Sequence, residues 1–149
     1  KRGQQGKDSI HNAVQNSCTE RKNIMEKKVI VSEKSPAAIG PYSQAIEYNG
    51  IVYTSGVIGV NPATGEVGET IEEQTTQVFE NLKGLLEDAG SLDQAIKTTV
   101  FIKNMDDFAK VNEIYATYFT GAFPARSCVE VARLPKDLLI EVEVTAIKG

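Results

Sequence analysis

The dipeptide Asn49-Gly50 separates two runs of alternating residues, and it restricts the fold more than any other short segment of the chain. Asn-Gly is the strongest short-range signal for a two-residue β-hairpin, because both central residues of that turn need a positive φ. Residues 42–48 and 51–60 are therefore predicted to form two antiparallel strands. Gly56 and Gly59 interrupt the second run, which indicates a bulge or a close approach of the backbone to another group.

Two further segments have the apolar spacing of helices. The first begins at Thr70-Ile-Glu-Glu73, a capping box in which Thr70 and Glu73 each satisfy a free backbone N–H group, and it ends at Gly90. The second is capped by Asn104 or Asp106 and ends at Gly121. Strands are predicted at 28–31, 95–103, 126–133 and 138–147.

The order of these elements is strand, hairpin, helix, strand, helix and two strands. It predicts an α+β fold, in which one sheet is covered by two helices on one face. The other face of the sheet is left open, and this favours an oligomer.

Composition excludes several classes of protein. The 149 residues suit one domain, and a net charge of −4 does not favour a broad electrostatic contact with nucleic acid. No apolar run is long enough to span a membrane, and the first residues lack the apolar stretch of a secretory signal. The two cysteines, Cys18 and Cys128, do not make a disulfide framework, so a cytoplasmic protein is expected.

Residues 1–24 differ from the rest of the chain. They are polar and hold the only histidine, His11. We interpret them as an N-terminal extension or leader, followed by a single domain of residues 25–149.

Arg126 and Glu141 are the charged residues whose positions point to a site. Arg126 opens an alternating run just after Pro124, and a fixed guanidinium binds a planar carboxylate or phosphate through two parallel hydrogen bonds. Glu141 is on the polar face of the last strand. In a plain hairpin of these two strands, Glu141 would lie opposite residue 131, roughly 17 Å from Arg126. A shared site therefore requires either a different strand pairing or a second subunit.

The residues available limit the chemistry. From Met25 onward there is no histidine, which argues against a Ser-His-Asp triad, a Cys-His pair and a histidine-based ribonuclease. One cysteine without histidine leaves no zinc cluster, so no metal is expected. An arginine, several carboxylates and hydroxyls such as those of Tyr42 and Ser55 remain. This set could bind a small carboxylate and activate a water molecule by general base catalysis.

The segment Phe123-Pro-Ala-Arg-Ser-Cys-Val-Glu-Val-Ala-Arg-Leu-Pro-Lys-Asp, followed by Ile140-Glu-Val, resembles the signature of the Rid family (YjgF, reactive intermediate deaminase A). Residues 37–44, 54–56, 61–65 and 97–102 match that family too, in one register from about Lys28 onward. The resemblance implies a chorismate-mutase-like α+β fold with a mixed sheet, and a homotrimer with clefts between subunits. It also implies hydrolysis of 2-imino acids to 2-oxo acids and ammonia without metal or cofactor.

The resemblance also assigns roles to residues. Arg126 is expected to bind the substrate carboxylate, and Glu141 to orient or activate the attacking water. The other expected pocket residues are Tyr42, Ser55, Gly56, Asn112 and Cys128. Two alternative functions stay open, an endoribonuclease or translation inhibitor and a non-catalytic module that binds small carboxylates.

Overall fold

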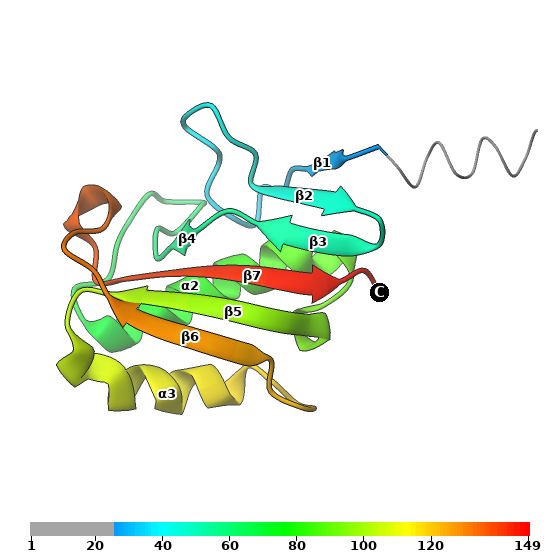
Figure 1. Cartoon of the computed structure of the whole chain (residues 1–149). Helices are drawn as coiled ribbons and strands as arrows, with labels where there is room; N and C mark the ends of the chain where they lie inside the picture. The colour runs from blue at the N-terminus through cyan, green and yellow to red at the C-terminus, as the bar shows by residue number, and fades with distance from the viewer. Residues whose placement is uncertain (1–25) are drawn as a thin grey trace, which may run out of the picture.

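Seven strands form one mixed sheet in the order β1-β2-β3-β7-β5-β6, and β4 pairs with β7 beside this path (Figure 1). The computed structural model describes residues 26–149, so the interpretation of residues 1–24, with His11 and Cys18, lies outside the described residues. The strands are β1 (Lys28–Ile30), β2 (Ala45–Tyr48), β3 (Ile51–Thr54), β4 (Val57–Ile58), β5 (Ala95–Ile102), β6 (Ala125–Glu130) and β7 (Ile140–Ile147). The helices are α2 (Ile71–Leu86) and α3 (Phe108–Thr117).

The hairpin at Asn49-Gly50 is confirmed, and both residues have the positive φ that the turn requires, at 51° and 77°. Its first strand starts three residues later than predicted, at Ala45. The second run is not one strand, because the chain leaves the sheet at Ser55 and Gly56 and returns as β4. Both β3 and β4 pair with β7. The predicted interruption at Gly56 therefore divides one strand into two.

The last two strands do not form a hairpin. Strand β5 lies between them, parallel to β6 and antiparallel to β7. Helix α3 connects β5 to β6 and allows the parallel pairing, which a short turn could not provide. The plain hairpin considered for Arg126 and Glu141 is therefore not the pairing that the structure shows. Strand β6 also ends at Glu130, three residues earlier than predicted.

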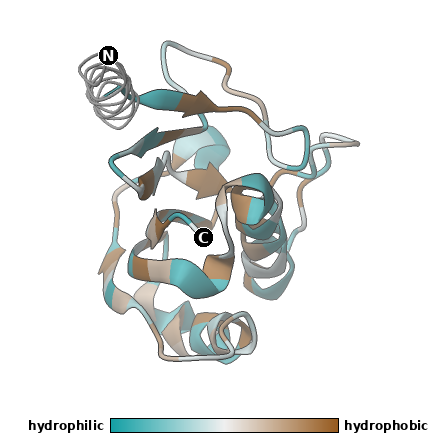
Figure 2. Cartoon of the chain, turned by 90° about the vertical axis from the view of Figure 1, so that its right-hand side faces the viewer, coloured by the Kyte–Doolittle hydropathy of each residue, from teal (hydrophilic) through white to brown (hydrophobic). Residues whose placement is uncertain are grey.

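The helices cover one face of the sheet, as the α+β prediction required. In Figure 1, α2 lies behind the strands, and the side view in Figure 2 shows the same two layers. The predicted capping box is confirmed: Glu73 N donates to the Thr70 side chain, and the Glu73 carboxylate accepts from Thr70 N. The core between the layers includes Phe79 and Leu82, both fully buried.

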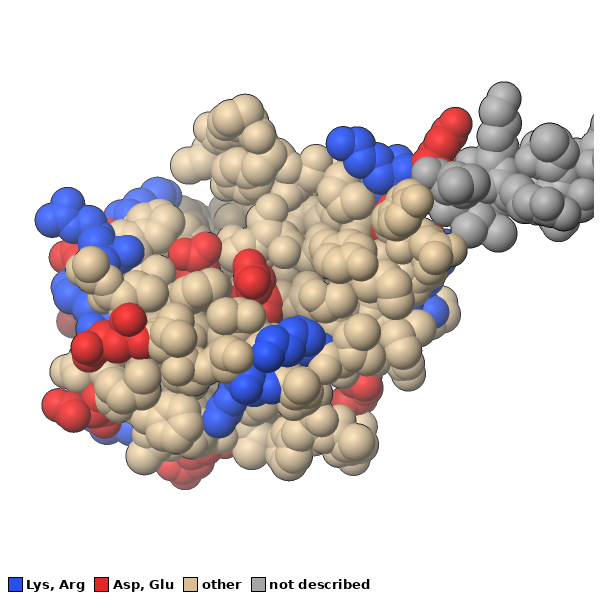
Figure 3. Space-filling model, in the orientation of Figure 1, with Lys and Arg blue, Asp and Glu red and all other residues tan. Residues whose placement is uncertain are grey.

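The opposite face of the sheet carries no helix within residues 26–149. Tyr53 and Ile147 are on this face, 48% and 45% exposed. Figure 3 views this face and shows mostly uncharged atoms, with a few acidic and basic side chains among them. No helix within the described part of the chain is long and apolar enough to cross a membrane.

Candidate functional site

A cavity of about 510 Å³ lies beside β4 and the loop that precedes β2. Four of the residues expected from the sequence line it, and we call them the carboxylate half-site: Tyr42, Ser55, Gly56 and Glu141. The Ser55 hydroxyl donates a 2.6 Å hydrogen bond to the Ser43 carbonyl, which orients its oxygen within the break between β3 and β4. The structure therefore brings together residues that are up to 99 positions apart in the chain.

Gly56 leaves room for the Glu141 side chain. A Cβ atom at position 56 would lie 1.7 Å from Glu141 Oε1 and 2.7 Å from its Cδ. No side chain larger than hydrogen fits unless the carboxylate moves. The close approach predicted from the glycine is confirmed, and its partner is Glu141.

The environment of Glu141 makes it a better base than an ordinary surface carboxylate. Burial raises its pKa above the usual value, and the like charge of Glu143 adds to the shift. A carboxylate with a raised pKa holds a proton more strongly when it accepts one. Glu141 can therefore accept a proton from a water molecule in this cavity.

Gln44 holds the loop that forms the other wall of the cavity. Its amide Nε2 donates to the carbonyls of Ser32, Ser35 and Pro36, and its Oε1 accepts from Ser32 N. Only 7% of the Gln44 surface is exposed, so these bonds replace its contacts with water. They connect residues 32–36 to the start of β2 and so place the loop that carries Tyr42.

Arg126 lies in a second cluster, which we call the guanidinium half-site: Phe108, Asn112, Tyr115, Arg126 and Cys128. Arg126 Nη1 donates a 2.6 Å hydrogen bond to Asn112 Oδ1. The guanidinium carbon is 5.2 Å from the centre of the Phe108 ring and 4.8 Å from that of Tyr115. Asn112 is only partly exposed, and Arg126 supplies a hydrogen-bond partner for its side-chain oxygen.

Cys128 is half-buried on the same face of β6 as Arg126. Burial raises the pKa of its thiol, and the nearby Arg126 charge opposes the shift only in part. A thiol with a raised pKa is a weak nucleophile. We therefore do not expect Cys128 to act as a nucleophile. It does not line the 510 Å³ cavity of its own chain, and its place in a pocket wall stays a prediction.

The two half-sites of one chain lie on opposite faces of the sheet. Arg126 is paired with Thr98 on β5, whereas Glu141 is paired with Phe101 on the same strand. The offset is three residues, and an odd offset points the two side chains to opposite faces. From strand rise and spacing, their Cα atoms are about 14 Å apart. One chain therefore does not bring Arg126 and Glu141 into contact.

Three residues with roles at these half-sites were not expected from the sequence. Phe108 and Tyr115 fit the apolar stripe of α3, and only their spacing of four and three residues from Asn112 connects them to Arg126. Gln44 ends the segment 37–44 that resembles the Rid family, but the sequence does not indicate its role, because its partners are backbone groups.

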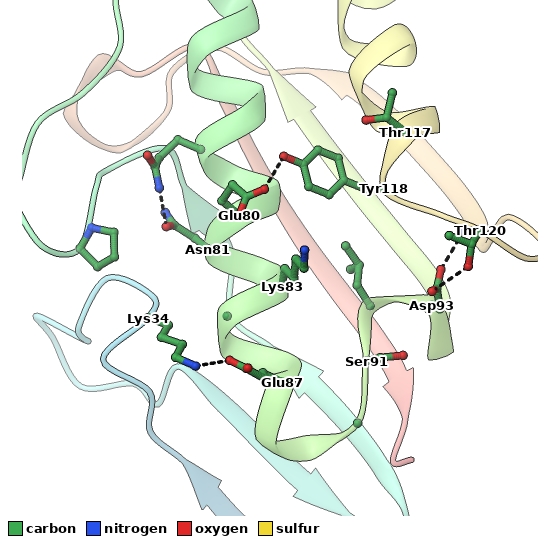
Figure 4. Close-up of a pocket in the computed structure, with 15 residues that line it drawn as sticks. Lys34, Glu80, Asn81, Lys83, Glu87, Ser91, Asp93, Thr117, Tyr118 and Thr120 are labelled. Carbon is green, nitrogen blue, oxygen red and sulfur yellow. Dashed lines mark hydrogen bonds and ion pairs between the residues drawn. The ribbon is translucent and has the colours of Figure 1, made fainter.

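A larger hollow, of about 710 Å³, lies on the helical side of the molecule (Figure 4). Several of its charged side chains already have partners within the protein. These pairs are Lys34 with Glu87, Glu80 with Tyr118, and Asp93 with Thr120. Groups engaged in this way are less available to a ligand, so we do not place the reaction in this hollow. Within residues 26–149, no cluster of three or more His, Cys, Asp or Glu side chains could hold a metal ion.

Comparison with known proteins decides the family. The family described as Endoribonuclease L-PSP matches residues 32–148. The chain belongs to this family. A RutC family protein of Pyrococcus abyssi is 52% identical over 126 residues, which cover 83% of this chain and 99% of the relative. The 2-iminobutanoate/2-iminopropanoate deaminase of Salmonella typhimurium is 50% identical over 125 residues, which cover 81% and 98% of the two chains.

A solved structure supports the same assignment. The Rid family protein YyfA of Yersinia pestis superposes with a TM-score of 0.80 at 53% identity, over 82% of this chain and 99% of that one. The resemblance to the Rid family that the sequence motifs indicated is therefore confirmed.

Proposed function

We propose that the protein hydrolyses reactive 2-imino acids, such as 2-iminobutanoate and 2-iminopropanoate, to 2-oxo acids and ammonia. The observation that carries this proposal is the pair of half-sites, one presenting a cation and the other a carboxylate of raised pKa beside a cavity. Relatives about 50% identical to this chain carry the name of this deaminase.

In the proposed reaction, Arg126 binds the substrate carboxylate and holds C2 of the imine near Glu141. A water oxygen attacks C2 while Glu141 accepts one of its protons. The imine nitrogen takes up a proton, and the product of this step is a 2-amino-2-hydroxy acid. The C2–N bond then breaks, ammonia leaves with a proton from the hydroxyl group, and a 2-oxo acid remains. The balance is imine plus water to oxo acid plus ammonia, so the steps require no redox partner and no cofactor.

We further propose that the active unit is a homotrimer with each site between two subunits. Two features support this: the half-sites of one chain face opposite sides of the sheet, and the open face carries exposed Tyr53 and Ile147. In such an assembly, Arg126, Asn112 and Cys128 come from one chain. The carboxylate half-site comes from its neighbour. We also expect the protein to act in the cytoplasm.

Mixing two inactive variants tests the shared site. When Arg126→Lys and Glu141→Gln chains are co-expressed in equal amounts, random trimers contain about a quarter of sites with both native groups. Turnover is then expected to recover to about that fraction of the wild-type value. Activity no higher than that of the two variants measured separately would contradict a site shared between subunits. Light scattering that shows a monomer at micromolar concentration would contradict the trimer.

The function itself is tested with freshly generated imine. An amino acid oxidase or a threonine dehydratase supplies the intermediate, and the loss of imine is followed with and without the protein. Faster loss supports the deaminase. Unchanged loss together with measurable binding of 2-oxobutanoate supports the carboxylate-binding module instead. Cleavage of RNA that is unaffected by Glu141→Gln would support a ribonuclease that works through other residues.

A further inference from the structure

The guanidinium group of Arg126 contacts neutral groups. Within residues 26–149, no carboxylate lies within ion-pair distance of its guanidinium, because the ion pairs of the structure involve only lysines. The groups that contact it are an amide oxygen and two aromatic rings. The charge is therefore not neutralised inside the protein and can attract an anion.

All three contacts come from one face of α3. Phe108, Asn112 and Tyr115 are separated by four and three residues, and this spacing places their side chains next to one another on a helix. The ring centres lie 5.2 Å and 4.8 Å from the guanidinium carbon, within the roughly 6 Å at which a cation is attracted to a π face. Because Asn112 accepts from Nη1, the edge formed by Nε and Nη2 remains for a planar carboxylate.

The Tyr115 ring is fixed by contacts with residues other than Arg126. Its hydroxyl lies 2.8 Å from Thr98 Oγ1, and both side chains are buried. Its ring contacts Phe79 and Phe119, with centre distances of 5.4 Å and 4.9 Å. These contacts keep the Tyr115 ring against Arg126. The Phe108 ring, which is the second ring near the guanidinium, is only half-buried.

We propose that Phe108 and Tyr115 are positioning residues for Arg126, and that they set the affinity and the charge preference for the substrate carboxylate. This inference rests on the proposed function. The two π faces limit the rotation of the guanidinium and leave its charge uncompensated. A carboxylate substrate then meets a receptor that is already oriented and needs little ordering on binding.

Phe108 is the position to vary, since it is only half-buried, whereas Tyr115 is buried. Phe108→Leu removes one π face and keeps an apolar side chain, whereas Phe108→Tyr keeps the face. Tyr118→Leu is the matched control, because it removes a half-buried ring that packs on Phe79 at 5.1 Å and is not one of the two rings over Arg126. For each chain, kcat and KM are measured with freshly generated 2-iminobutanoate. Dissociation constants are measured by calorimetry for 2-oxobutanoate and for its neutral amide.

Loss of one cation–π contact is expected to raise KM and the dissociation constant of 2-oxobutanoate about threefold to thirtyfold, with kcat within about threefold of wild type. The preference for 2-oxobutanoate over its amide should fall by the same factor. Phe108→Tyr should restore wild-type values, and Tyr118→Leu should keep the preference.

Two results would overturn the inference. One is a Phe108→Leu protein with unchanged KM and unchanged preference for the carboxylate. The other is an equal loss of preference in Tyr118→Leu, which would show a general effect of core packing. If the wild-type protein binds 2-oxobutanoate but does not hydrolyse the imine, the deaminase proposal fails, while a binding loss in Phe108→Leu still supports the positioning role. A wild-type protein that neither binds nor hydrolyses would overturn both.

Discussion

Replacing Gly56 by alanine should move the Glu141 carboxylate without unfolding the protein. The added Cβ would lie 1.7 Å from Oε1, so that oxygen has to retreat by about 1.5 Å or more to reach an ordinary contact distance. The φ angle of Gly56 is not in the left-handed region, so the backbone can accept alanine. The atoms that clash belong to the far end of a flexible side chain, and this end can move.

The expected result is a large loss of turnover with little loss of stability. Displacing a reacting group by about 1 Å can cost roughly a hundredfold in rate, so we expect kcat to fall by about that factor. Alanine also restricts the unfolded chain, which contributes about 0.4–1 kcal/mol in favour of the folded state and offsets part of the strain. The thermal midpoint should therefore change by only a few degrees.

Steady-state kinetics on freshly generated imine, with buffer hydrolysis subtracted, measure the effect. Gly121→Ala is the control, because it adds the same methyl group where no atom lies within 4 Å. In a protein that already carries Glu141→Gln, Gly56→Ala should lower kcat by less than about threefold more, since both changes act on the same side chain. Turnover of Gly56→Ala within threefold of wild type would refute the reasoning, and so would a loss that is fully additive with Glu141→Gln.

The other predictions concern the two charged residues, their surroundings and the N-terminal segment. Glu141→Gln should lower kcat by about 10² to 10⁴-fold with binding of 2-oxobutanoate retained, because the amide cannot accept a proton from water; a drop under threefold would remove Glu141 from the mechanism. Arg126→Lys should weaken binding by roughly tenfold to over a hundredfold despite the conserved charge, since lysine cannot form the paired contact; unchanged kinetics would show that Arg126 does not bind the substrate carboxylate. Activity should be lost as the pH falls through the raised pKa of Glu141. Glu143→Gln removes a like charge that raises this pKa, so the acid limb of the plot of kcat against pH should move to lower pH. An acid limb that stays in place or moves to higher pH would contradict the role of Glu141 as the base. A chain that begins at Met25 should fold and turn over normally, because the family match starts at residue 32; a tenfold loss would show that the extension reaches the site.

Local patterns were enough to predict the order of the main helices and strands, but not every boundary. Asn49-Gly50 and the Thr70 capping box depend on residues close together in the chain, so both could be recognised without a structure. The position of β5 between β6 and β7 could not, because it depends on how α3 packs across the sheet. The sequence therefore left two arrangements open for Arg126 and Glu141, and only the observed pairing shows that they occupy opposite faces.

The candidate site was predictable to the extent that its residues are chemically distinctive. Gly56 indicated that its backbone lies close to another group, but no neighbouring residue in the sequence indicated that this group is the Glu141 side chain. The roles of Phe108 and Tyr115 could not be predicted, because apolar residues at helical spacing give the same pattern whether they pack on a sheet or on a guanidinium. The role of Gln44 could not be predicted, because its partners are backbone groups, which every residue carries.

The place of β7 in the sheet has a consequence for the newly made chain. The hydrogen-bonded path from β3 to β5 runs through β7, although β7 is the last of these strands in chain order. Until the ribosome has translated residues 140–147, the chain therefore holds two separate pieces of sheet, and the edges of β3 and β5 have no partner. Unpaired edges can associate with other chains. A pause in translation shortly before Ile140 would thus expose the protein to aggregation more than a pause before β1.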